Sequence, residues 1–96
     1  MAVERTIVVR TPEGLHARPA ALFVQTAGRF SGDIELEARG QKANGKSILS
    51  VLKLGVHYGE ALTIRTRGGE ERDEQAVLNR LVAILSGLND GGPVQD

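Results

Sequence analysis

The segment "EGLHARPAAL", residues 13–22, places His16, Arg18 and Pro19 within four positions of one another, directly before an apolar run. A neutral imidazole nitrogen is a competent nucleophile near pH 7, and it can pass on a phosphoryl group because the phosphoramidate bond is labile. A guanidinium such as that of Arg18 pairs well with phosphate oxygens. These residue types in this order predict reversible phosphorylation of His16, with a passive surface histidine as the alternative.

The same segment carries the signals of a helix start. Pro19 has no N–H group to lose in a first helical turn, and its fixed φ angle suits one, so we expect His16 as the N-cap. Because Pro19 biases Arg18 away from the helical region, we expect a slightly distorted entry. The amides of Ala17 and Arg18 then stay unpaired, since the first donors of a helix have no carbonyl partner. With the helix dipole and the Arg18 side chain, they predict a pocket for a dianion beside the imidazole.

Four segments have the character of strands. "TIVVR", residues 6–10, is β-branched and stops at the turn signals of "TPEG". Residues 33–39 and 61–67 alternate apolar with polar side chains, as strands do that have one face on a core and the other in water. A short strand at residues 41–43 is expected between them. The inner-face residues are Ile34, Leu36, Ala38, Leu62 and Ile64.

Three segments have the spacing of helices. Residues 17–28 repeat apolar side chains at helical intervals, and Gly28 is a suitable end. Residues 47–55 begin at Ser47, a good N-cap, and stop at Gly55. The acidic residues within 70–74 lie where a helix dipole favours negative charge, at the start of the last helix. The apolar residues at helical spacing in the first and last helices are Ala20, Phe23, Val24, Ala27, Val77, Leu78, Leu81, Leu85 and Leu88.

The resulting order is β-α-β-β-α-β-α. One-sided alternation in the strands and one-sided apolar stripes in the helices predict an α+β fold, in which helices cover one face of an antiparallel sheet. A chain of 96 residues is expected to form one domain with a hydrophobic core of modest size. We place this domain at residues 1–90 and expect a frayed tail at residues 91–96.

The helix at residues 47–55 is apolar around most of its circumference, although a short helix on one face of a sheet cannot bury every side. If Val51 and Leu54 face the core, then Ile48, Leu49 and Leu52 form an exposed apolar patch. Such a patch predicts a docking surface. The alternative is that the last helix folds over these three side chains.

The composition narrows the classes of partner. Twelve basic and twelve acidic side chains cancel, and three aromatic side chains offer little stacking for bases, so nucleic acid is not expected as a partner. There is no cysteine, hence no disulfide and no thiolate metal site. The N-terminal segment lacks the apolar run of a signal peptide, and no run reaches membrane-spanning length. We therefore expect a cytoplasmic protein without membrane insertion.

Two segments resemble a known family. "GLHARPAALFVQTA" resembles the active-site motif of HPr, the histidine-containing phosphocarrier of the bacterial phosphoenolpyruvate-dependent phosphotransferase system, and "NGKSILSVLKLG" resembles the segment that carries its regulatory serine and second helix. Length and element order agree as well, so the resemblance extends over nearly the whole chain. It implies an open-faced β-sandwich, with a four-stranded antiparallel sheet covered by three helices.

The resemblance implies a phosphocarrier rather than a turnover enzyme. His16 would accept a phosphoryl group on Nδ1 from Enzyme I, which phosphoenolpyruvate charges, and would pass it to the IIA component of a sugar permease. Arg18 and the backbone amides of Ala17 and Arg18 would hold the phosphoryl group. We expect a monomer that needs no metal and no cofactor.

The resemblance also assigns partner contacts and a regulatory position. Ile48, Leu49 and Leu52 would dock partner proteins, and Ala20 and Gln25 are weaker candidates for the same surface.

Ser47 matches the serine that a dedicated kinase, HPr kinase/phosphorylase, modifies in many Gram-positive lineages. A phosphate on Ser47 would place negative charge inside the docking surface. The alternative is a plain N-cap, which is worth about 1 kcal/mol relative to alanine.

Some residues depart from the family pattern and leave the choice of partner open. His57 matches no catalytic position, and we interpret it as an exposed turn residue. Alternatives to the sugar carrier are related carriers that serve a nitrogen-regulatory branch or a dihydroxyacetone kinase, and a regulatory binding module that uses Ser47 as its switch. The departures are Glu13, Ser50, Lys53 and the pair Gly68 and Gly69.

Overall fold

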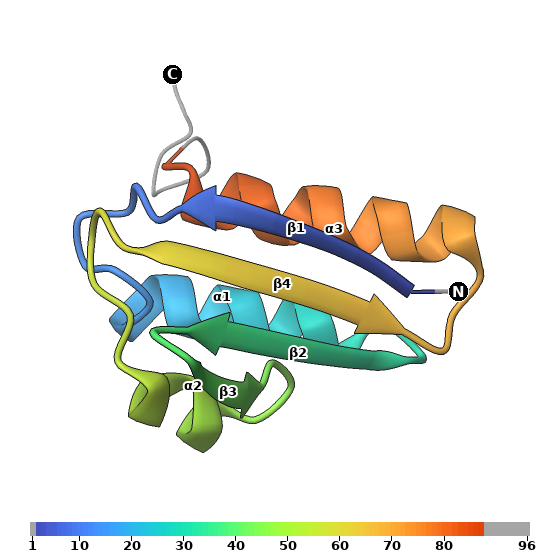
Figure 1. Ribbon diagram of the computed structural model, residues 1–96, viewed down its shortest axis with the longest axis horizontal. Helices are drawn as coiled ribbons and strands as arrows, with labels where there is room; N and C mark the ends of the chain where they lie inside the picture. Colours follow the sequence, from blue (N-terminus) through green and yellow to red (C-terminus); the bar gives the residue numbers. More distant parts are fainter. Residues whose placement is uncertain (1, 88–96) are drawn as a thin grey trace.

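The chain folds into an antiparallel sheet with helices on one side (Figure 1). The computed structural model describes residues 2–87. The sheet order is β1-β4-β2-β3, and all neighbouring strands are antiparallel, which confirms the predicted α+β open-faced β-sandwich. The elements are β1 (Ala2–Val8), α1 (Ala17–Gly28), β2 (Asp33–Ala38), β3 (Gln41–Asn44), α2 (Ile48–Leu54), β4 (Ala61–Arg67) and α3 (Glu71–Leu85).

The core lies between the sheet and the two long helices, which run behind the sheet in Figure 1. The inner positions of β2 and β4 are buried, as their alternation predicted. In α1 the buried residues include Pro19 and Ala20 of the first turns, so the start of this helix is anchored to the core. The largest fully buried apolar side chains are Phe23, Leu15, Leu36, Leu62, Ile64, Leu78, Leu81 and Leu85.

The first strand is longer and earlier than predicted. It spans Ala2–Val8 instead of residues 6–10, because β4 offers partners along that whole length, from Arg67 opposite Ala2 to Ala61 opposite Val8. Val9 follows the strand; its amide still donates to the Glu60 carbonyl at 2.9 Å, and its side chain is buried in the core. The charged residues Glu4 and Arg5 obscured the start of the strand; Glu4 lies on its exposed outer face, and Arg5 is half-buried on the other face of this edge strand.

A tight hairpin joins β2 to β3. Arg39 (φ 53°) and Gly40 (φ 76°) both have positive φ, as a type I′ turn requires, and Ala38 pairs with Gln41 across it. The predicted short strand is thereby confirmed as β3. An arginine in the left-handed region is unusual, because that region is costly for residues with a Cβ.

The start of α3 contains a buried acid. Glu74 is fully buried, although its position in an acidic run indicated only a favourable interaction with the helix dipole. Its Oε2 atom accepts a hydrogen bond from the Gly69 amide at 3.3 Å, while its Oε1 atom has no partner among residues 2–87. Gly69 in turn lies against the Phe30 ring, where a Cβ would come within 2.6 Å of ring atoms. Gly69 therefore makes room for a close contact between the start of α3 and the core.

The predicted stripe of α3 is buried at Val77, Leu78, Leu81 and Leu85, and Ile84 joins it. Leu88 and the predicted tail at residues 91–96 lie outside the described residues. Within the described part of the chain, none of the helices combines the length and apolar character that a membrane crossing needs.

Candidate functional site

His16 is the N-cap of α1, as predicted. Its backbone is extended (φ −135°, ψ 171°), and its carbonyl accepts the first helical hydrogen bond from the Ala20 amide at 3.3 Å. The imidazole makes no capping hydrogen bond and is half-buried. The side chain of His16 is thus placed at the positive end of the helix dipole without being used to cap it.

The helix entry is distorted at Ala17. This residue has a φ angle of 52°, in the left-handed region, whereas the sequence predicted a slight distortion at Arg18. Leu15 and Pro19, two residues to either side of Ala17, are both buried. Holding a non-glycine residue in this region costs about 1–3 kcal/mol. Ala17 and Arg18 are both exposed, so an anion can approach them from solvent.

The loop before His16 is clamped to the segment that follows α2. The Leu15 amide donates to the Val56 carbonyl at 2.9 Å, and Gly14 (φ 69°) packs so closely that a Cβ would lie 2.4 Å from the same oxygen. The hydroxyl of Thr11 donates to the Gly14 carbonyl at 2.7 Å. This clamp fixes where His16 emerges.

His57 lies beside His16, and this proximity was not predicted. The ring centroids of the two histidines are 6.1 Å apart, and the ring planes are tilted by 38°. The interpretation of His57 as an exposed turn residue is confirmed. Its amide donates to Glu60 Oε1 at 2.7 Å; this bond and then the Arg39 guanidinium hold the pKa of Glu60 below its ordinary value. No sequence signal pairs two histidines that lie in separate loops.

Ser47 is the N-cap of α2, as predicted. Its Oγ atom accepts a hydrogen bond from the Ser50 amide at 3.2 Å, and Gly55 (φ 65°) ends the helix in the left-handed conformation. Ser47 therefore caps the start of α2.

The exposed side of α2 is apolar, as predicted. Ile48, Leu49 and Leu52, which we call the α2 patch, are exposed by 44%, 67% and 37%, whereas Val51 and Leu54 are buried. The alternative, in which the last helix folds over these residues, is wrong for the described part of the chain. An unburied apolar surface on a helix this short is typical of an interaction site.

One weaker docking candidate is wrong. Ala20 is fully buried, because it shares the inner stripe of α1 with Phe23 and Ala27 at helical spacing. Gln25 is exposed on the same helix. Leu22, which we did not single out, is 36% exposed there.

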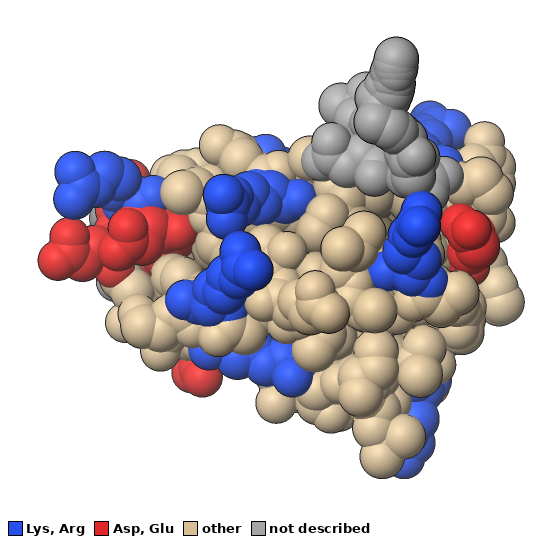
Figure 2. All heavy atoms as spheres, turned by 180° about the vertical axis from the view of Figure 1, so that it is seen from behind, with Lys and Arg blue, Asp and Glu red and all other residues tan. Residues whose placement is uncertain are grey.

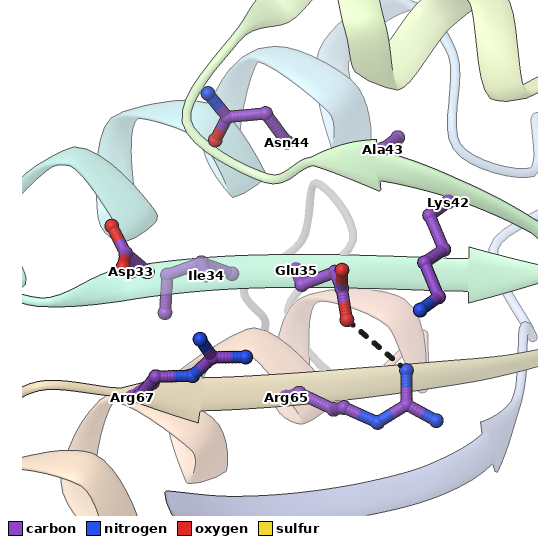
Figure 3. A pocket seen from close by; sticks show the side chains of 8 residues that line it. All are labelled: Asp33, Ile34, Glu35, Lys42, Ala43, Asn44, Arg65 and Arg67. Atoms are coloured by element: carbon purple, nitrogen blue, oxygen red, sulfur yellow. Dashed lines mark hydrogen bonds and ion pairs between the residues drawn. The ribbon is translucent and has the colours of Figure 1, made fainter.

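An open hollow on the outer face of the sheet lies away from this site (Figure 3). Arg65 in β4 binds three carboxylates, those of Glu37 at 2.7 Å, Glu4 at 2.8 Å and Glu35 at 3.2 Å. These bonds, with Glu37 first, hold the pKa of Arg65 above its usual range. Because three acidic side chains neutralise its guanidinium, Arg65 is not available to bind an anion in this hollow. Its polar lining is Asp33, Glu35, Lys42, Asn44, Arg65 and Arg67.

The helical side of the molecule has a different charge pattern (Figure 2). Lysine and arginine side chains are spread singly over this face, whereas acidic side chains gather mainly at one edge. Within residues 2–87, three or more potential metal-ligating side chains do not come together. At the start of α1, the described residues place a half-buried histidine that makes no capping hydrogen bond two positions before an exposed arginine, Arg18.

Comparison with known proteins gives concordant matches. The family model described as the PTS HPr component phosphorylation site matches residues 3–86. The HPr-like protein Crh of Halalkalibacterium halodurans is 42% identical over 83 residues, which cover 86% of this chain and 95% of the relative.

Two solved structures are similar over most of their length. The phosphocarrier protein HPr of Bacillus anthracis superposes with a TM-score of 0.81 at 40% identity, covering 88% of this chain and 96% of the other. Crh of Bacillus subtilis, described as a catabolite repression protein that forms a domain-swapped dimer, has a TM-score of 0.65 at 44% identity, with coverages of 86% and 92%. The chain therefore belongs to the HPr family of the phosphotransferase system, a family of phosphocarrier proteins.

Proposed function

We propose that this protein carries phosphoryl groups in a sugar phosphotransferase system, with His16 as the carrier residue. Nδ1 of His16 accepts a phosphoryl group from phosphorylated Enzyme I, and the new P–N bond breaks again when an IIA component takes the group. The observation that supports this role is the position of His16 as the N-cap of α1, where its imidazole makes no capping hydrogen bond. The protein is modified and restored in each cycle, so it is not a turnover enzyme.

The residues around His16 have separate tasks in this proposal. Ala17 and Arg18 contribute the first two amides of α1, for which a helix offers no carbonyl partner, and the positive end of the helix dipole favours an anion there. The guanidinium of Arg18 offsets the charge of the phosphoryl group. Because Ala17 and Arg18 are exposed, a partner protein can bring its own reacting group to the same place.

The α2 patch is the proposed docking surface for Enzyme I and IIA components, with Gln25 as a peripheral contact. Apolar side chains at the centre of an interface provide most of its binding energy, and polar residues surround them. The single cations on the helical side favour partner surfaces with acidic side chains (Figure 2). We propose that the protein works as a monomer in the cytoplasm.

Ser47 is the proposed regulatory position, a substrate for a kinase of the HPr kinase/phosphorylase type. A phosphate on Ser47 adds about −1.5 to −2 charges at the start of α2, next to Ile48 and Leu49. The helix itself tolerates the added charge, but an apolar docking surface does not. Phosphorylation of Ser47 therefore weakens transfer to His16.

A second candidate is a regulatory module that binds its target through the α2 patch. The observation in its favour is the similarity to proteins named Crh, one of which is described as a catabolite repression protein. His16 favours the carrier, because a module that acts only by binding has no need of a phosphorylatable histidine at this position. Crh of Bacillus subtilis is described as a dimer, so the oligomeric state of this chain in solution tests the second candidate. A dimer would favour it.

The decisive experiment is to incubate the protein with phosphoenolpyruvate and Enzyme I, and then to measure its mass. We expect one acid-labile phosphoryl adduct on the wild type and none on His16→Ala. The chain has two histidines, so His57→Ala is the matched control and must still gain the adduct. An HPr of known activity verifies Enzyme I in the same assay. A wild type that gains no phosphate under these conditions contradicts the carrier role.

A further inference from the structure

Two imidazoles meet at the start of α1. His16 belongs to the helix entry and His57 to the loop after α2, and their ring centroids are 6.1 Å apart. This distance lies within the range of aromatic pairs, but both rings carry polar nitrogen atoms. A histidine ring has at least one N–H donor whether it is neutral or charged. His57 can therefore donate a hydrogen bond to an anion placed next to His16.

The backbone around His57 is held from both sides. Gly14, two residues before His16, packs directly onto the Cα atom of His57, at 2.9 Å from where its own Cβ would be. On the other side the His57 amide donates to Glu60 Oε1 at 2.7 Å, and the Glu60 amide donates to the His57 carbonyl at 3.1 Å. These contacts support the backbone of the loop, and its His57 ring lies beside that of His16.

Arg39 completes this support. Its Nη1 atom donates to Glu60 Oε1 at 2.7 Å, and its Nη2 atom donates to the Leu54 carbonyl at the end of α2. The position is a poor one for arginine in terms of the backbone, because type I′ turns favour Asn, Asp or Gly. The contacts with Glu60 and Leu54 give a reason for an arginine there, since no smaller side chain reaches both.

We propose that His57 is a second phosphate-contacting residue, which donates a ring N–H hydrogen bond to the phosphoryl group on His16, and that Arg39 and Glu60 are its positioning residues. The inference rests on the proposed phosphorylation of His16. The charged groups that face His57 are the Glu60 carboxylate in its own loop and Arg39 behind that carboxylate, with His16 on the adjoining helix start. Hydrogen bonds to charged phosphate oxygens are stronger than those between neutral groups. His57 therefore stabilises the phosphorylated form over the free form.

Two substitutions of His57 separate a hydrogen bond from an aromatic contact. His57→Phe keeps the ring but has no N–H donor, whereas His57→Gln keeps a donor but has no ring. His57 is exposed, so both variants are expected to fold. With Enzyme I and a fixed ratio of phosphoenolpyruvate to pyruvate, we expect the equilibrium ratio of phosphorylated to free protein to fall about three- to tenfold in His57→Phe. His57→Gln should remain within about twofold of the wild type.

A second measurement does not depend on Enzyme I. Phosphoramidate phosphorylates histidine chemically, and the ³¹P chemical shift of phosphorylated His16 reports the contacts of the phosphoryl oxygens. We expect the same shift in the wild type and His57→Gln, and a different one in His57→Phe; His16→Ala identifies any signal from His57. Equal shifts in all three proteins overturn the proposed contact, even where Enzyme I charges His16 normally. The opposite result is a different shift in His57→Phe alone, together with a wild type that Enzyme I does not phosphorylate. It would contradict the carrier function but support the contact between His57 and the phosphoryl group.

Arg39→Asn tests the positioning role. Asparagine suits the turn, so the midpoint of thermal unfolding should not fall, yet the bonds to Glu60 and Leu54 are lost. We expect the phosphorylation equilibrium to fall part of the way to that of His57→Phe, and the double variant to fall no further than His57→Phe alone. Arg29→Asn is the matched control, since Arg29 is exposed and makes no ion pair among residues 2–87. If the effects of the two single substitutions on the phosphorylation equilibrium add up in the double variant, Arg39 does not act through His57.

Discussion

Gly14 and Val56 approach each other so closely that a Cβ on Gly14 would lie 2.4 Å from the Val56 carbonyl oxygen. The contact joins the loop before His16 to the loop that carries His57, and the Leu15 amide reinforces it with a hydrogen bond to the same carbonyl at 2.9 Å. Two surface loops that are distant in sequence are therefore in direct backbone contact. His16 owes its position to this contact as much as to the helix that it starts.

Gly14→Ala should destabilise the fold more than Gly40→Ala does. Both glycines have positive φ, at 69° and 76°, so alanine costs about 1–2 kcal/mol at either position. A Cβ at Gly40 meets nothing within 4 Å, whereas one at Gly14 collides with backbone, which adds about 1–3 kcal/mol. Urea unfolding measures both losses. Equal losses of unfolding free energy in the two variants would show that the loop can shift to accommodate the Cβ. The close contact between Gly14 and Val56 would then not fix the position of the loop.

The elements of the fold follow from local signals, and these were predictable. Ser47 and Gly55 have the side-chain chemistry of helix ends, and the structure places them there. The alternation in residues 33–39 and 61–67 gives the buried faces of β2 and β4, because one face of each strand meets the core. Such signals lie within a few residues of the feature that they predict.

The unpredicted features depend on contacts between distant segments. His57 lies beside His16 where Gly14 packs on its loop, and Ala17, with its positive φ, lies between the buried residues Leu15 and Pro19. Glu74 is buried through its place beside Gly69 rather than through the helix dipole. Ala20 differs, because its spacing already indicated the inner face of α1. Its assignment to the docking surface conflicted with that pattern.

Three substitutions at Ser47 should separate capping from charge. Ser47→Ala loses the bond to the Ser50 amide and should lower the free energy of unfolding by about 1 kcal/mol. Ser47→Asn and Ser47→Asp both cap well, so both should leave stability nearly unchanged. Only Ser47→Asp adds charge beside Ile48, and we expect it to slow phosphoryl transfer from Enzyme I. Equal rates of phosphoryl transfer to the Asn and Asp variants would show that negative charge at position 47 does not slow the transfer.

Leu49→Ser should impair transfer without affecting the fold. Leu49 is 67% exposed, so its loss from the surface should change the free energy of unfolding by no more than about 0.5 kcal/mol. If the α2 patch docks partners, the KM for the protein as a substrate of Enzyme I should rise several-fold. Val8→Ser is the control, because Val8 is also an exposed apolar residue, at 41%, but lies on the outer face of the sheet. A similar rise in both variants would point to a nonspecific effect.

Glu60→Gln should alter the dependence of stability on pH. The His57 amide and Arg39 hold the pKa of Glu60 below its ordinary value of about 4.5, because both favour the charged carboxylate. A carboxyl group whose pKa is lower in the folded state stabilises the protein above the pKa of the unfolded state, and this contribution is lost as the pH falls through the folded pKa. The wild type should therefore be more stable than Glu60→Gln at pH 7, with a difference that shrinks below about pH 4.5. Urea unfolding of both proteins over a pH series measures it, and a difference that is constant with pH would mean that Glu60 titrates alike in the folded and unfolded chains.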